Sequence, residues 1–151
     1  MTRITQYDIR LNPDKTAMLV KEKAVNYEPG GAVDSPKKAV DLLTYLFNPG
    51  TLAQEHFYVI ALGPARRAAG VFDVTSGTLM SCLVHPREVF QRLLLCGAAS
   101  FIAAHNHPSG RLDISDQDIE VTNRLRNAGE LMGIHLDDHL IIADQEFVSC
   151  R

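Results

Sequence analysis

The chain has 151 residues, and its 15 Lys and Arg residues stand against 18 Asp and Glu residues, which gives a formal net charge of −3 at pH 7. A chain of this length can form one domain with its own hydrophobic core, so no disulfide or structural metal is needed for folding, and any bound metal is expected to be functional. The negative charge also lacks the excess of Lys and Arg with which dedicated nucleic-acid-binding proteins neutralise phosphates, so no nucleic-acid partner is expected.

The compartment is predicted from the apolar runs and the cysteines. No apolar run approaches the roughly 18 residues needed to cross a bilayer, and the N-terminal residues lack the apolar region of a signal peptide. The three cysteines, Cys82, Cys96 and Cys150, are odd in number and widely spaced. This pattern is typical of reduced thiols and not of a disulfide framework or a Cys-x-x-Cys metal clip. We therefore expect a cytoplasmic protein without a membrane partner.

The N-terminal segment has the pattern of a β-hairpin. Residues 4–11 and 16–25 alternate between apolar and polar side chains, and Asn12-Pro13-Asp14 forms a turn signal between them. Residues 26–34, with Pro29-Gly30-Gly31, have the composition of a connection. We expect residues 1–34 to form a hairpin arm and linker, and residues 35–151 to form the domain that carries the chemistry.

The rest of the chain interleaves predicted helices and strands. Apolar spacing and capping residues predict helices from Ser35-Pro36 to Asn48, from Pro86 to Gly97 and from Ser115 to about Gly133. Short apolar or alternating runs predict strands at 57–62, 71–74, 79–84, 100–104, 140–142 and 147–148. This order predicts an α/β fold with a mixed central sheet flanked by helices.

Two histidines at the end of a predicted strand indicate a metal site. His105 and His107 are two positions apart, so their side chains project from the same face, and Pro108 stiffens the backbone that follows. Asp118 lies three residues after the expected helix start at Ser115, where its carboxylate can reach the same point. Two histidines and one aspartate leave a fourth coordination position open, which is typical of a catalytic zinc site with one Zn²⁺ per chain.

The same residues resemble a known family. His105-Asn106-His107-Pro108, followed after six residues by Ser115-Asp116-Gln117-Asp118, matches the His-x-His-Pro-x6-Ser-x-x-Asp signature of the JAB/MPN (JAMM) metalloproteases. The segments Val84–Phe90, Ala104–Gly110 and Asp138–Ile142 more narrowly resemble the JAB domain of the bacterial RadC-like proteins. The resemblance covers residues 35–151 and implies a cytidine-deaminase-like α/β fold, with His105, His107 and Asp118 as zinc ligands.

The resemblance also implies two catalytic residues. A glutamate on the first core strand acts in the family as general base toward the water that zinc activates, and a serine stabilises the tetrahedral intermediate. The matching residues are Glu55 and Ser115. Glu88, in the first turn of the second predicted helix, is the alternative base. RadC-like proteins carry a helix-hairpin-helix-like domain before the JAB domain, and only residues 1–34 stand in that place here.

Some of these residues also have structural explanations. Ser115 and Asp118 have the spacing of a capping box, and a carboxylate that ligates zinc is expected to have less freedom to close it. Ser115 would then cap alone or turn toward the substrate oxyanion. His85, His135 and His139 are expected to be packing histidines or partners of ligands, and not ligands themselves.

Three functions follow as hypotheses. The first is a zinc-dependent hydrolase of peptide or isopeptide bonds, with a peptide or protein substrate. The second is a noncatalytic JAB scaffold that binds a peptide or partner. The intact ligand set argues against this hypothesis. The third is a DNA-repair or mobile-element accessory factor of the RadC type, which the net charge does not favour.

Overall fold

The protein is described by a computed structural model that covers residues 2–77 and 84–151. Its strands are β1 (Thr2–Leu11), β2 (Ala17–Tyr27), β3 (His56–Leu62), β4 (Ala68–Ser76), β5 (Ser100–Asn106), β6 (His135–Ala143) and β7 (Glu146–Ser149). Its helices are α1 (Pro36–Phe47), α2 (Pro86–Leu95) and α3 (Asp116–Met132), and two short 3-10 turns cover Pro49–Thr51 and Pro64–Arg66.

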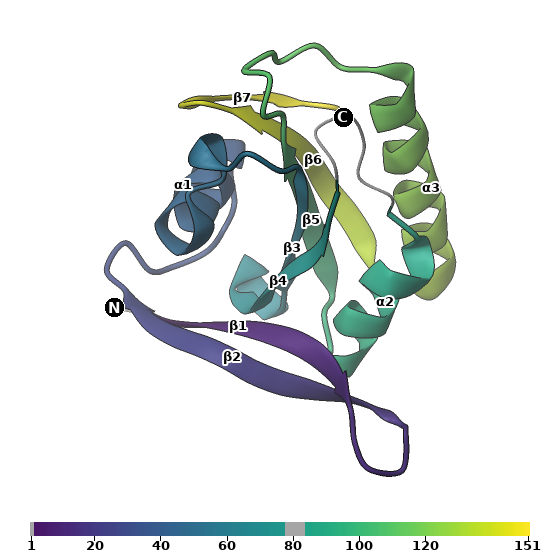
Figure 1. Cartoon of the computed structure of the whole chain (residues 1–151). Coiled ribbons are helices and arrows are strands. Elements are labelled where there is room, and N and C mark those ends of the chain that lie inside the picture. Colours follow the sequence, from purple (N-terminus) through teal and green to yellow (C-terminus); the bar gives the residue numbers. More distant parts are fainter. Residues whose placement is uncertain (1, 78–83) are drawn as a thin grey trace.

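The strands form one mixed sheet in the order β2-β1-β4-β3-β5-β6-β7 (Figure 1). The pairs β1/β4 and β5/β6 are parallel, whereas β1/β2, β3/β4, β3/β5 and β6/β7 are antiparallel. The central strands β3 and β5 are apolar and β-branched or aromatic along most of their length, as strands buried on both faces require. The predicted α/β fold with a mixed, helix-flanked sheet is confirmed.

The first two strands form the predicted hairpin, and β1 joins it to the rest of the sheet. Thr2 pairs with Tyr27 and Leu11 with Ala17, around a turn in which the Thr16 N–H donates to the Asn12 side chain. Gln6 of β1 pairs with Val71 of β4. The hairpin therefore extends the central sheet. The division of the chain into arm and domain at residue 35 stays a prediction.

The three helices begin and end where their capping residues predict. The side chains of Ser35, His85 and Ser115 accept hydrogen bonds from backbone N–H groups in the first turns of α1, α2 and α3. Asn48 after α1 and Gly133 after α3 adopt the left-handed conformation that ends a helix. Local signals thus define all three helices.

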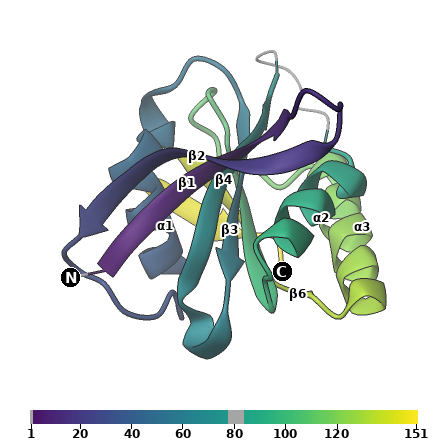
Figure 2. The ribbon, with the colours of Figure 1, turned by 90° about the horizontal axis from the view of Figure 1, so that it is seen from below.

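The helices divide between the two faces of the sheet. Figure 2 shows α1 on one side of the strands and α2 and α3 on the other. Successive residues of β3 alternate between these faces, so Tyr58, Ile60 and Leu62 pack with α1, whereas Phe57, Val59 and Ala61 pack with α2 and α3. The sheet is therefore buried between two separate apolar cores.

Some predicted strands are shorter than the observed ones, and one predicted strand lies almost wholly outside the described residues. β4 runs from Ala68 to Ser76 and β6 starts at His135, so both are longer than predicted. The strand predicted at 79–84 lies almost wholly outside the described residues, as does Cys82, and Val84 is not in a strand. Cys96 and Cys150 are free, partly buried thiols. No helix in the described ranges is long and apolar enough to span a bilayer.

Candidate metal centre

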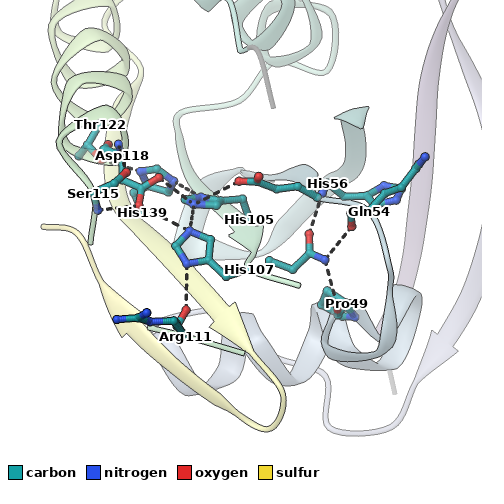
Figure 3. A network of polar contacts seen from close by, with 12 residues as sticks. Pro49, Gln54, His56, His105, His107, Arg111, Ser115, Asp118, Thr122 and His139 are labelled. Atoms are coloured by element: carbon teal, nitrogen blue, oxygen red, sulfur yellow. Dashed lines mark hydrogen bonds and ion pairs between the residues drawn. The ribbon is translucent and has the colours of Figure 1, made fainter. Parts of the chain in front are cut away.

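The end of β5 places two imidazoles side by side on the face that α3 covers. His105 lies on the same face of β5 as the core residues Phe101 and Ala103, and its ring stacks on Phe57 of β3. The chain leaves the strand after Asn106, and the His107 N–H continues the pairing by donating to the Ile142 carbonyl. The Nε2 atoms of His105 and His107 are 3.0 Å apart (Figure 3). The predicted convergence of the two rings is present.

The first turn of α3 brings Asp118 to the same point. Its Oδ1 lies 3.1 Å from His105 Nε2, and its Oδ2 lies 3.5 Å from His107 Nε2. The capping box is complete, because the Ser115 N–H donates to Asp118 Oδ2 and the Asp118 N–H donates to Ser115 Oγ, each at 3.0 Å. The carboxylate closes the cap and contacts both histidines at once, because it has two oxygens and several acceptor positions. The expected competition between the cap and zinc ligation stays a prediction.

Glu55 is the glutamate that the fold brings to the histidines. It directly precedes β3, and its Oε1 lies 3.9 Å from His105 Nε2 with 13% of its side chain exposed. Within residues 2–77 and 84–151, Glu55, His105 and His107 form a group whose potential ligand atoms all lie within 4.8 Å of one another. Glu88 instead has a half-exposed side chain in the first turn of α2, 3.5 Å from Arg92 Nη1.

The hydrogen bond on the far side of His107 fixes its tautomer. Its Nδ1 lies 2.9 Å from the Arg111 carbonyl oxygen, which can only accept a hydrogen bond, so Nδ1 carries the proton. In the neutral ring, Nε2 is then unprotonated and its lone pair faces Asp118 and His105. Metal-ligating histidines are usually oriented in this way by a partner of the second ring nitrogen.

A chain of three hydrogen bonds fixes the tautomer of His105. The Thr122 hydroxyl donates to the Asp118 carbonyl at 2.8 Å, so Thr122 Oγ1 accepts from His139 Nδ1–H at 2.6 Å. His139 Nε2 is then an acceptor and receives the Nδ1–H of His105 at 2.9 Å. Burial lowers the pKa of His139 to about 3, which keeps this ring neutral. The lone pair of His105 Nε2 consequently points into the cluster.

Sequence reasoning named His139 as a possible partner of a ligand but missed Thr122. The signal for Thr122 is its position four residues after Asp118, because residues i and i+4 lie on the same face of a helix. Of the other histidines, His85 caps α2 and His135 is exposed at the start of β6.

Burial and charge perturb the ionisable groups of the cluster. Burial raises the pKa of Glu55, although His105 and His107 act in the opposite direction. The hydrogen bond to Asp118 raises the pKa of His107. Burial works to raise the pKa of Asp118, but hydrogen bonds that His105 and His107 donate when Nε2 is protonated, together with the Ser115 backbone N–H, outweigh it and hold the pKa well below its usual range. Such perturbed groups concentrate at functional sites.

The donor set fits a zinc ion. Two imidazole nitrogens present lone pairs, and the Asp118 carboxylate lies beside both. A tetrahedral zinc ion, with Zn–N distances of about 2.0–2.1 Å, holds two nitrogen ligands roughly 3.3 Å apart, and the observed separation is 3.0 Å. Two histidines and one carboxylate also leave a position for water or substrate, as in catalytic zinc sites.

The model of the RadC-like JAB domain family matches residues 33–151. The chain belongs to this family. A UPF0758 protein of Bacillus licheniformis is 51% identical over 100 residues, which are 66% of this chain and 45% of the relative. The UPF0758 protein YsxA of Bacillus subtilis is 49% identical over 100 residues, 66% of this chain and 43% of the relative.

A UPF0758 protein of Desulforudis audaxviator is 47% identical over 98 residues, which are 65% of this chain and 43% of the relative. The matches to these RadC-like JAB relatives span less than half of the relatives' own length. The names of these relatives state no activity.

Proposed function

We propose that the RadC-like JAB domain of this protein is a zinc-dependent hydrolase of peptide or isopeptide bonds. The observation that carries the proposal is the convergence of two imidazole lone pairs with two carboxylates at one partly buried point, with both Nδ1 atoms already bonded. The resemblance to the JAB/MPN metalloproteases supplies the substrate class. His105, His107 and Asp118 would hold the metal.

A zinc ion at these ligands would lower the pKa of water and polarise a carbonyl group. Glu55 is the proposed general base, which takes a proton from the attacking water and returns it to the leaving amine. Its carboxylate lies beside His105, and its raised pKa brings it closer to neutral pH, where proton transfer in both directions is most effective.

Ser115 is the proposed hydrogen-bond donor to the oxyanion. Its Oγ accepts the Asp118 N–H, and a hydroxyl that accepts in this way still has its own proton to donate. Its place at the exposed start of α3, one turn from the ligand Asp118, leaves it within reach of a substrate carbonyl bound there. The positive end of the helix dipole favours negative charge at the same place.

The test combines metal analysis with a panel of peptide and isopeptide substrates. The wild-type protein should carry one zinc ion and cleave at least one substrate in a chelator-sensitive manner. Glu55→Gln should retain zinc and lose activity, and Ser115→Ala should reduce the rate about 10²–10³-fold. Glu88→Gln is the matched control and should behave as wild type. An inactive Glu88→Gln variant together with an active Glu55→Gln variant would contradict the assignment of Glu55 as the base.

Two other outcomes would favour the alternative functions. A noncatalytic scaffold would bind zinc and a partner peptide, and both Glu55→Gln and Ser115→Ala would leave that binding intact with no cleavage in any variant. An accessory factor acting on DNA would bind duplex or single strands at submicromolar concentration, with an affinity that falls steeply as salt rises. Such binding, unaffected by His107→Ala, would overturn the hydrolase proposal.

A further inference from the structure

Asn106, between the two histidines, makes three hydrogen bonds on the opposite face of the sheet. Its Nδ2 donates to the carbonyls of Pro49 at 3.2 Å and Gln54 at 2.9 Å, and its Oδ1 accepts the His56 N–H at 2.6 Å. The residue is 1% exposed. Figure 3 shows these bonds running from the histidine strand to the segment that enters β3.

The partners of the Asn106 side chain determine its orientation. Backbone carbonyls only accept and a backbone N–H only donates, so the amide nitrogen must face Pro49 and Gln54, and the oxygen must face His56. Both amide hydrogens are used. A buried amide satisfied in this way holds its partners in place, because breaking one bond leaves a buried polar group without a partner.

The three bonds converge on the backbone around Glu55. The Gln54 carbonyl belongs to the peptide group before Glu55, and the His56 N–H belongs to the peptide group after it, so one amide holds both. The Glu55 carbonyl in turn accepts the Gly77 N–H at 2.9 Å. The backbone from which the Glu55 side chain reaches His105 is therefore fixed on both sides.

The segment before Glu55 has a second anchor at Gly50. A Cβ atom on Gly50 would lie 2.2 Å from the Asp144 carbonyl oxygen, so the 3-10 turn at Pro49–Thr51 packs directly against the turn between β6 and β7. The turn is thereby held between Asn106 and Asp144. Its position is set by the same strands, β5 and β6, that carry His105 and His139.

We propose that Asn106 is a positioning residue for Glu55, which sets the carboxylate relative to the two histidines by clamping the peptide groups on both sides of it. The inference rests on the proposed function, because it assigns Asn106 a role in aligning the proposed base with the proposed metal ligands. Adjacent residues of one strand thus have separate tasks: His105 faces the proposed metal site, and Asn106 faces the segment that carries the proposed base.

The first experiment measures hydrogen exchange in the metal-free protein. Asn106→Ala and the nearly isosteric Asn106→Asp, which sets a carboxylate against two carbonyls, should speed exchange at the His56 amide and across residues 50–56 by about tenfold or more. Asn106→Ser keeps one hydroxyl and should have an intermediate effect, and it serves if the other variants do not fold. Asn26→Asp, at an exposed position on β2, is the matched control and should not change exchange there.

The second experiment separates positioning from a general loss of structure. Co²⁺ affinity is measured by competition titration for wild type, Glu55→Gln, Asn106→Ala and the double variant. If Asn106 acts through Glu55, then Asn106→Ala weakens Co²⁺ binding no more than Glu55→Gln does. In the Glu55→Gln background, Asn106→Ala then lowers the Co²⁺ affinity by a further factor of less than about two. With a cleaved substrate, Asn106→Ala should lower kcat and leave KM within about twofold.

Unchanged hydrogen exchange at residues 50–56 in Asn106→Ala would overturn the proposal. A full loss of Co²⁺ affinity that persists in the Glu55→Gln background would also overturn it, because Asn106 would then act on the histidines. The absence of hydrolysis in the wild-type protein would count against the proposed function alone, since neither the exchange rates nor the Co²⁺ cycle depends on turnover.

Discussion

The two faces of the central sheet are built differently. Apart from Asn106 and its hydrogen bonds at the end of β5, the face under α1 is filled by aliphatic and aromatic side chains, among them Leu42, Leu43 and Ile60. The face under α2 and α3 is equally apolar near α2, but at the end of β5 it contains a buried polar cluster that includes His105, Thr122 and His139. Buried polar groups are tolerated where each has a partner, as in this hydrogen-bonded chain.

The comparison suggests that stability and chemistry are largely assigned to opposite faces. The α1 face would then set the free energy of unfolding, and the α3 face would set metal affinity. Substitutions on the two faces should therefore have separable effects, and the following predictions test that separation from the largest effect to the smallest.

The largest effect is expected from His107→Ala on the α3 face. It removes one of the two proposed imidazole ligands, so zinc affinity should fall by more than about 100-fold, beyond the range for partners of ligands. Elemental analysis after dialysis should find no zinc, and circular dichroism should be unchanged. Equal zinc in wild type and in the His105→Ala/His107→Ala variant would contradict the site.

Leu43→Ala tests the other face. Leu43 is fully buried against the sheet, so truncation should lower the free energy of unfolding by about 2–5 kcal/mol through lost burial and a cavity. Urea unfolding with chelator present measures this change. The folded variant should still bind zinc with wild-type affinity, and a tenfold weaker affinity would show that the faces are coupled.

Thr122→Val probes the hydrogen-bond chain behind His105. The substitution keeps the side-chain shape but removes the hydroxyl that His139 contacts, so the His105 tautomer is no longer fixed. Zinc affinity should fall about tenfold or more. Thr44→Val, at an exposed position of α1, is the control and should change neither affinity nor stability by more than about 0.5 kcal/mol.

The smallest effect concerns pH in the metal-free protein. An unfolded histidine takes up a proton near pH 6.5, whereas burial lowers the pKa of folded His139 to about 3, so acid favours the unfolded chain below pH 6.5. Between pH 6.5 and 5.5, wild type should lose about 1 kcal/mol of unfolding free energy more than His139→Asn does.

His107 acts in the opposite direction, mainly above pH 6.5. The pKa of His107 is raised by Asp118, so its contribution is present below its unfolded pKa and is lost as pH rises through the folded pKa. For this reason the comparison with His139→Asn, and not the wild-type slope alone, isolates His139. Identical slopes in the two proteins would contradict the buried, neutral state of His139.

Local sequence signals predicted the helices and the central strands well. Ser35, Pro86 and Ser115 lie at helix starts because capping and first-turn proline depend on neighbouring residues only. The pair of histidines was also predictable, because side chains two apart on a strand share a face. Asp118 needed the motif spacing, since the packing of α3 beside β5 is not encoded locally.

The partners of these residues were harder to predict because they come from distant parts of the chain. His139 and His105 are 34 positions apart, and Asn106 and His56 are 50 apart. No periodicity or spacing indicates which strands become neighbours, and the parallel pairing of β5 with β6 brings His139 beside His105. Which of Glu55 and Glu88 lies near the histidines likewise depends on strand order.

The shared role of Asp118 has a consequence for protein engineering. The same carboxylate accepts the Ser115 N–H and contacts both histidines, so a substitution that changes this member of the proposed ligand set also alters the start of α3. Replacing Asp118 with His to favour softer metals would remove the half of the capping box that accepts the Ser115 N–H, and so weaken the start of α3. A design that changes metal preference at this position therefore has to restore helix initiation elsewhere in the same turn.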